Sequence, residues 1–222
     1  MRILLGFMNQ ERRAIFLLVT IVLFFILAPL LENNAVGELI LIVNLYLTLV
    51  AATMELAEKR ALFWSAIPLA ATSMVLLLAS HFRPSWPLLF ANSLILASFL
   101  MLVSVSLFAY LGKKAQITSG RLYVSVSLYF LLGLGWFALY SLLNTIQPGS
   151  FAEAGLALTG RAPPSKILYF SLATLTTLGY GDIVAVKPAA RMAATLEAAS
   201  GVLYVAITVA RLVASYQAPD RR

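Results

Sequence analysis

Nine residues in this sequence, Thr174 to Asp182, have types and a spacing that suit the binding of a cation. They read T-L-T-T-L-G-Y-G-D and lie between long apolar stretches. Glycine adopts left-handed backbone dihedrals without steric cost, so Gly179 and Gly181 permit a backbone that alternates between right- and left-handed conformations. Such a backbone can turn successive carbonyl oxygens the same way. A row of carbonyl oxygens can take the place of the water molecules around a cation.

The pattern T-x-G-Y-G-D from Thr177 to Asp182 resembles the selectivity filter of potassium channels, with Leu178 at the position that the family usually fills with valine. The resemblance implies that potassium is the permeant ion and that no cofactor is needed. It also implies that backbone carbonyls bind the ion, together with the Thr177 hydroxyl. The residues of this filter are Thr177, Leu178, Gly179, Tyr180 and Gly181.

Two aromatic residues before the filter have an expected supporting role. In the family, the positions of Tyr169 and Phe170 form an aromatic cuff that packs against the filter tyrosine, which is Tyr180 here. Aromatic residues in membrane helices also serve simply as packing or interface groups, and both interpretations stay open.

Two polar residues flank the filter, Thr176 before it and Asp182 after it. Both are expected to support its conformation. Some members of the family carry a glutamate behind the filter that pairs with this aspartate, but the matching position here is Ala173. Asp182 is therefore expected to meet water, an aromatic N–H or O–H group, or Lys187.

The composition predicts an integral membrane protein. The chain has 222 residues, of which 61% are hydrophobic and 11% charged, and its mean hydropathy is +0.92. A single histidine and the absence of cysteine leave no clustered catalytic set, so no enzyme is expected. The formal net charge of +7 comes from basic residues scattered among the loops, which argues against a nucleic-acid partner.

The apolar runs predict an all-α fold with six transmembrane helices. The expected spans are residues 14–31, 36–54, 62–80, 88–111, 122–146 and 189–215. A short re-entrant pore helix, 165–176, with Ser165 as a possible cap, and the filter at 177–181 lie between the last two spans. The expected organisation is an N-terminal segment 1–13, a four-helix domain 14–112, a linker 113–121, a pore domain 122–216 and a tail 217–222.

Basic residues indicate the orientation. With both termini in the cytoplasm of a cell-membrane protein, only five of the sixteen basic residues lie outside, as the positive-inside rule favours. These five are Arg83, Arg161, Lys166, Lys187 and Arg191. Because one chain supplies one filter strand, the pore requires a homotetramer surrounded by membrane lipid.

The last span carries candidate gating residues. Gly201 is expected either to act as a hinge for an inner gate or to allow close helix packing. Glu197 lies one turn earlier. It is expected either to tune ion entry or sense protons, or simply to form a hydrogen bond to the pore helix. The resemblance implies that four residues line the cavity and inner gate: Val202, Val205, Val209 and Val213.

The fourth span, 88–111, contains no Lys, Arg, Asp or Glu. A conventional voltage sensor needs several charges in this helix, so only weak voltage dependence is expected. The sequence therefore predicts a potassium-selective channel that conducts passively. A non-selective cation channel and a non-conducting channel-like subunit stay open as alternatives.

Overall fold

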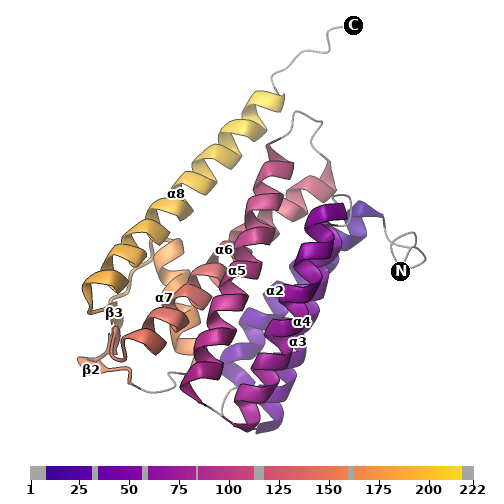
Figure 1. Ribbon diagram of the computed structural model, residues 1–222. Helices are drawn as coiled ribbons and strands as arrows, with labels where there is room; N and C mark the ends of the chain where they lie inside the picture. The colour runs from indigo at the N-terminus through magenta and orange to yellow at the C-terminus, as the bar shows by residue number, and fades with distance from the viewer. Residues whose placement is uncertain are drawn as a thin grey trace, which may run out of the picture.

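The computed structural model of the chain describes residues 9–31, 35–56, 60–83, 85–112, 118–159 and 163–216. Most of the predicted N-terminal segment and linker, and the whole tail, lie outside these ranges. Six helices in the described part of the chain are long and apolar enough to span a membrane. They are α2 (Gln10–Leu31), α3 (Ala35–Glu55), α4 (Arg60–Phe82), α5 (Trp86–Leu111), α6 (Ser119–Ile146) and α8 (Pro188–Tyr216) (Figure 1). The six predicted spans are thus confirmed as helices, although the first begins at Gln10 rather than at residue 14.

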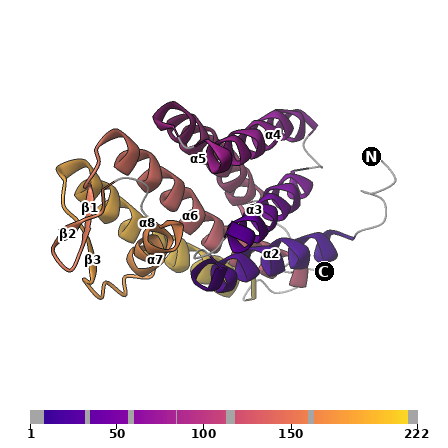
Figure 2. The same ribbon diagram turned by 90° about the horizontal axis from the view of Figure 1, so that it is seen from below.

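Helix α6 lies at the centre of the molecule. Helices α2 and α5 pack against one side of it, and α3 and α4 lie beyond them (Figures 1 and 2). Helix α8 and the short helix α7 pack against its other side. The shared core is formed by fully buried side chains such as Leu17 of α2, Phe99 of α5 and Leu131 of α6. The four helices before α6 therefore make one unit that reaches the rest of the chain mainly through α6.

Helix α7 (Pro164–Leu175) is too short to cross a membrane. At 1.5 Å per residue it is about 18 Å long, against a hydrocarbon core of about 30 Å. It begins at Pro164, where proline is favoured because the first helical N–H needs no partner within the helix. Ser165 was expected as a possible cap, but it lies inside the first turn, and the capping position is Pro163. The helix bounds otherwise agree with the predicted 165–176 to within one residue.

A three-stranded antiparallel sheet departs from the all-α prediction. Its strands are β1 (Phe151–Glu153), β2 (Leu156–Ala157) and β3 (Ile183–Ala185), in the order β2-β1-β3. Ala154 and Gly155 connect β1 to β2 with φ values of 49° and 82°. Positive φ at both central residues is the geometry of the tight hairpin turn that matches strand twist. Strand β3 then pairs with β1 across the intervening helix α7, from Phe151 opposite Ala185 to Glu153 opposite Ile183.

Candidate functional site

The segment from Thr176 to Asp182 follows α7 directly and is neither helix nor strand. Its backbone has φ values of 58° at Thr177, 55° at Gly179 and 80° at Gly181, while the residues between them have ordinary negative values. The left-handed conformation expected at the two glycines is present. The same conformation at Thr177 was not expected, because a β-branched residue rarely adopts it. Positive and negative φ values thus alternate along T-L-G-Y-G.

Backbone hydrogen bonds fold the start of this segment against the end of α7. The Thr177 N–H donates to the Thr174 carbonyl at 2.9 Å, and the Gly179 N–H donates to the Ala173 carbonyl at 3.1 Å. The Thr176 hydroxyl donates to the Leu172 carbonyl at 2.7 Å. Thr176 therefore stabilises the junction between the helix and the irregular segment.

The sheet holds the other end of the segment. Asp182 directly precedes β3, and its carbonyl accepts a hydrogen bond from the Ala154 N–H at 3.3 Å. The Val186 N–H donates to the Ser150 carbonyl at 2.8 Å, which closes the far end of the same strand pair. The chain leaving the segment is thus fixed by backbone pairing with residues that precede α7.

A side-chain hydrogen bond links the end of the segment to α7. The Tyr169 hydroxyl on α7 donates to Oδ1 of Asp182 at 3.0 Å. Partial burial, with the adjacent Asp182 carboxylate, raises the pKa of the Tyr169 phenol. Of the partners expected for Asp182, the structure therefore contains the aromatic O–H group.

Phe170 faces away from the segment. It is buried, and its ring centroid lies 5.2 Å from that of Tyr140 on α6 and 5.0 Å from that of Phe151 on β1. Of the two roles left open for Phe170, these contacts correspond to packing within the core. No ring pair joins Tyr180 to Phe170 or Tyr169 within the described chain, so an aromatic cuff stays a prediction.

The segment is open in the single chain. All residues from Thr176 to Asp182 are exposed, including the large side chains of Leu178 (56%) and Tyr180 (72%). Three predicted cavity residues on α8, Val202, Val205 and Val209, are also exposed and share one helix face. The side chain of the fourth, Val213, lies outside the described residues.

Two glycines let the neighbouring helices approach α7 closely. A Cβ atom at Gly201 of α8 would lie 2.0 Å from the carbonyl oxygen of Leu175. At Gly133 of α6, a Cβ would lie 3.0 Å from Cδ2 of Leu172. Helix α8 continues without a break past Gly201. The structure therefore supports the packing role that was one of the two alternatives for Gly201, and a hinge stays a prediction.

Glu197 is completely buried where α6, α7 and α8 meet. The Tyr140 hydroxyl of α6 donates to its Oε2 at 2.5 Å. The Ser171 hydroxyl of α7 lies 2.6 Å from its Oε1. The hydrogen bond expected between Glu197 and the short helix before the segment is thus present, through Ser171 of α7. Sequence reasoning missed Tyr140 and Ser171, although a tyrosine in the middle of an apolar helix signals a buried partner for its hydroxyl.

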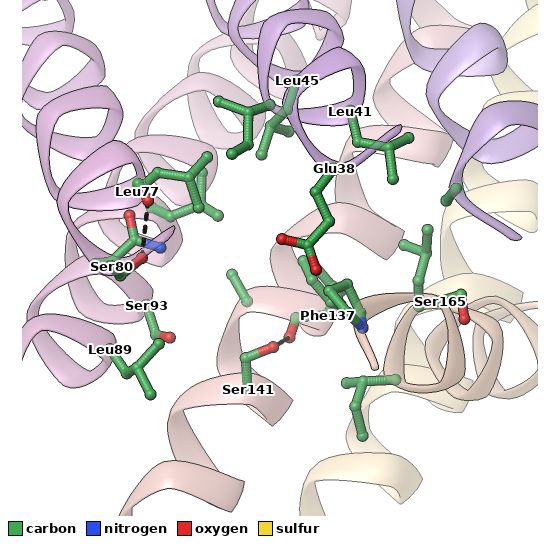
Figure 3. Close-up of a pocket in the computed structure, with 18 of the residues that line it drawn as sticks. Glu38, Leu41, Leu45, Leu77, Ser80, Leu89, Ser93, Phe137, Ser141 and Ser165 are labelled. Atoms are coloured by element: carbon green, nitrogen blue, oxygen red, sulfur yellow. Dashed lines mark hydrogen bonds between the residues drawn. The ribbon is translucent and has the colours of Figure 1, made fainter. Parts of the chain in front are cut away.

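A separate cavity of about 180 Å³ lies between the first helices and the start of α7. Figure 3 shows part of its lining, to which α2, α3, α4, α5, α6 and α7 all contribute. The labelled polar residues are Glu38, Ser80, Ser93, Ser141 and Ser165. None of the residues from Thr176 to Asp182 lines it, so this cavity is distinct from the candidate site.

Comparison with known proteins bears on this part of the chain. A family model described as "Ion channel" matches residues 149–218, which include β1, α7, the irregular segment and α8. This part of the chain resembles an ion channel. The inward rectifier potassium channel Kirbac3.1 of Paramagnetospirillum magnetotacticum is 29% identical over 89 residues, which are 40% of this chain and 26% of that protein. No solved structure matches the chain.

These matches support a pore region of the potassium-channel type and point to a non-enzymatic channel. The six long apolar helices fit such a membrane protein. The chain matches only about a quarter of the length of the curated relative, since the shared region covers 26% of it.

The contact at Gly201 predicts a specific stability defect. Gly201→Ala places a methyl group against a backbone carbonyl, so we expect the variant to lose about 1–3 kcal/mol of stability, as overpacked sites do. Thermal unfolding of the purified protein in detergent measures this loss. Gly135→Ala is the control, because the nearest atom to its new Cβ is Cβ of Leu100 at 3.9 Å. Equal melting temperatures for Gly201→Ala and the wild type contradict the packing role.

Proposed function

We propose that this chain is the subunit of a potassium-selective channel and that Thr177, Leu178, Gly179, Tyr180 and Gly181 form one strand of its filter. The observation that carries the proposal is the alternation of positive and negative φ along these residues. It occurs in an exposed segment held at both ends by backbone hydrogen bonds. Similarity to an ion-channel family and to a potassium channel supports the same assignment.

Ion binding in this proposal uses backbone oxygen atoms. Carbonyls of residues 177–180 and the Thr177 hydroxyl replace the water shell of a potassium ion, and no cofactor takes part. Anchors at Ala173 and Ala154 keep the segment from relaxing into a different backbone conformation. Restricted relaxation favours the ion whose coordination matches the spacing of the oxygens.

Helix α7 serves as the pore helix. It is too short to span the bilayer, and it leads directly into the filter strand. We place it as a re-entrant helix, with its carboxyl end toward the membrane centre. That end carries roughly half a negative charge, which stabilises a cation before it enters the filter.

One strand per chain implies a homotetramer around a central axis. Helix α8 supports this arrangement, because only 22% of its most apolar stretch is buried within the single chain. Its exposed apolar residues include Met192, Leu196, Val202, Val205 and Val209. We propose that Val202, Val205, Val209 and Val213 line the inner cavity and gate, and that the tetramer lies in the cell membrane with its termini in the cytoplasm.

Gating in this proposal does not use a conventional voltage sensor. Helix α5, which occupies the position of the sensor helix in six-helix channels, contains no charged residue. Moving charge through the membrane potential is the energy source of steep voltage gating, and α5 has none to move. The first four helices then act as a scaffold around α6.

Substitution in the filter strand tests the function. We expect Gly179→Ala to abolish potassium flux into liposomes, because a Cβ atom at φ 55° costs roughly 1–2 kcal/mol and distorts the strand. Gly155→Ala is a matched control, since Gly155 has φ 82° and open space around it but lies in the β1–β2 turn. Gly155→Ala should keep its flux. Normal flux from Gly179→Ala contradicts the carbonyl filter.

The oligomeric state provides a second test. We expect native mass measurement of the purified protein to give four copies of the chain, because four strands are needed to surround one ion. The same preparation must conduct potassium after reconstitution. A monomer or dimer that conducts is incompatible with one filter strand per chain.

A further inference from the structure

Glu197, Tyr140 and Ser171 form a buried polar cluster that joins three helices, which we call the Glu197 cluster. Glu197 and Ser171 are both 0% exposed, and so is Tyr140. The cluster connects α8 to α6 through Tyr140 and to α7 through Ser171. Ser171 also contacts α6, because its Oγ lies 2.8 Å from the carbonyl oxygen of Gly133. Ser171 thus ties α7 both to Glu197 of α8 and to Gly133 of α6.

Counting hydrogen atoms identifies the protonation state of Glu197. The Ser171 hydroxyl has one hydrogen but lies close to two oxygens, Oε1 of Glu197 at 2.6 Å and the Gly133 carbonyl at 2.8 Å. A carbonyl oxygen only accepts, so the serine hydrogen is needed for Gly133. The short contact between Ser171 and Glu197 then requires a hydrogen on the carboxyl group. A carboxylate would leave two oxygen atoms facing each other without a hydrogen between them.

The surroundings of Glu197 provide no charge to balance a carboxylate. The titratable groups facing it are two phenols of α6, Tyr140 and the more distant Tyr129. The contact from α7 is the neutral hydroxyl of Ser171. No described cation forms an ion pair with Glu197. Burial of a carboxylate without a cation is costly, whereas the neutral acid satisfies all its neighbours.

We propose that Glu197 is a neutral carboxylic acid at neutral pH and acts as a proton-dependent latch on α7. The acid donates to Ser171, Ser171 donates to Gly133, and Tyr140 donates to the carboxyl Oε2. Loss of the proton makes the carboxylate compete for the hydrogen of Ser171, so the link from α7 to Gly133 of α6 is broken. Because α7 leads directly into the segment that begins at Thr176, this change loosens the filter strand. The effect on conduction rests on the proposed channel function, but the protonation state does not.

The latch predicts a direction of pH dependence. The neutral acid is the intact form, so potassium flux should fall as the pH rises. Above the titration point the neutral fraction of a single acid falls about tenfold per pH unit, and the flux should follow it. Glu197→Gln keeps the hydrogen-bond pattern, since an amide N–H donates to Ser171 and the amide carbonyl accepts from Tyr140. This variant should conduct and should lack the alkaline loss.

Infrared spectroscopy of the full-length protein tests the protonation state without conduction. At neutral pH, the spectrum of Glu197→Gln should lack one protonated-carboxyl band that the wild type has. Loss of a carboxylate band instead overturns the proposal. Should Glu197→Gln fail to fold, Ser171→Ala tests the same point, because removal of its hydrogen-bond acceptor should shift the protonated band. An unshifted band in that variant also overturns the latch.

Flux measurements across alkaline pH complete the test, with Glu153→Gln as the control. Glu153 is a carboxyl of β1 that pairs at the surface with Lys166, so its replacement should leave the alkaline loss unchanged. An alkaline loss that persists in Glu197→Gln overturns the latch while leaving the channel function intact. If the wild type shows the protonated-carboxyl band of Glu197 but conducts no potassium, the channel function is overturned and the protonation state of Glu197 is upheld.

Discussion

The alternation of positive and negative φ from Thr177 to Gly181 is the constraint on which the rest of the structure depends. Two of its three left-handed positions are glycines, but Thr177 pays a conformational cost of roughly 1–2 kcal/mol. Such backbone persists only where its surroundings determine it from several sides. Here the end of α7 holds one side through Ala173, and the β1–β3 pairing holds the other through Asp182. The small sheet is thus as much a part of the candidate site as the segment itself.

Helix α7 is in turn positioned by close approach of the neighbouring helices as well as by the packing of large side chains such as Phe170. Gly201 of α8 and Gly133 of α6 bring their helices against its last turn, where a methyl group at Gly201 would meet the Leu175 carbonyl. Between these glycines the Glu197 cluster adds polar links through Tyr140 and Ser171. In an apolar environment, polar links and small residues supply the specificity of helix packing that the hydrophobic effect supplies in water. Glu197, although ionisable and fully buried, thus serves as one of these polar links.

Long-range features of the fold were harder to predict from the sequence than local ones. Six apolar runs predicted the six long helices, and two glycines predicted left-handed backbone in the segment. The sheet was missed because its strands have two or three residues each and because β3 pairs with β1 only across α7. The Ala154–Gly155 turn was a weak local signal for it. The left-handed Thr177 and the pairing of Glu197 with Tyr140 and Ser171 depend on tertiary packing, for which the sequence carried at most the signal of a tyrosine within an apolar helix. Assembly, selectivity and gating stay predictions.

The central claim is that the strand from Thr177 to Gly181 selects potassium. The most direct measurement is the reversal potential of the purified, reconstituted protein with potassium on one side of the membrane and sodium on the other. We predict a large reversal potential of the sign that potassium permeation produces. A control recording with equal potassium concentrations on both sides should reverse at zero, which excludes an offset in the measured potential. A reversal near zero under the two-ion condition, from a protein that conducts, would show that this strand does not discriminate between the ions and would contradict the account.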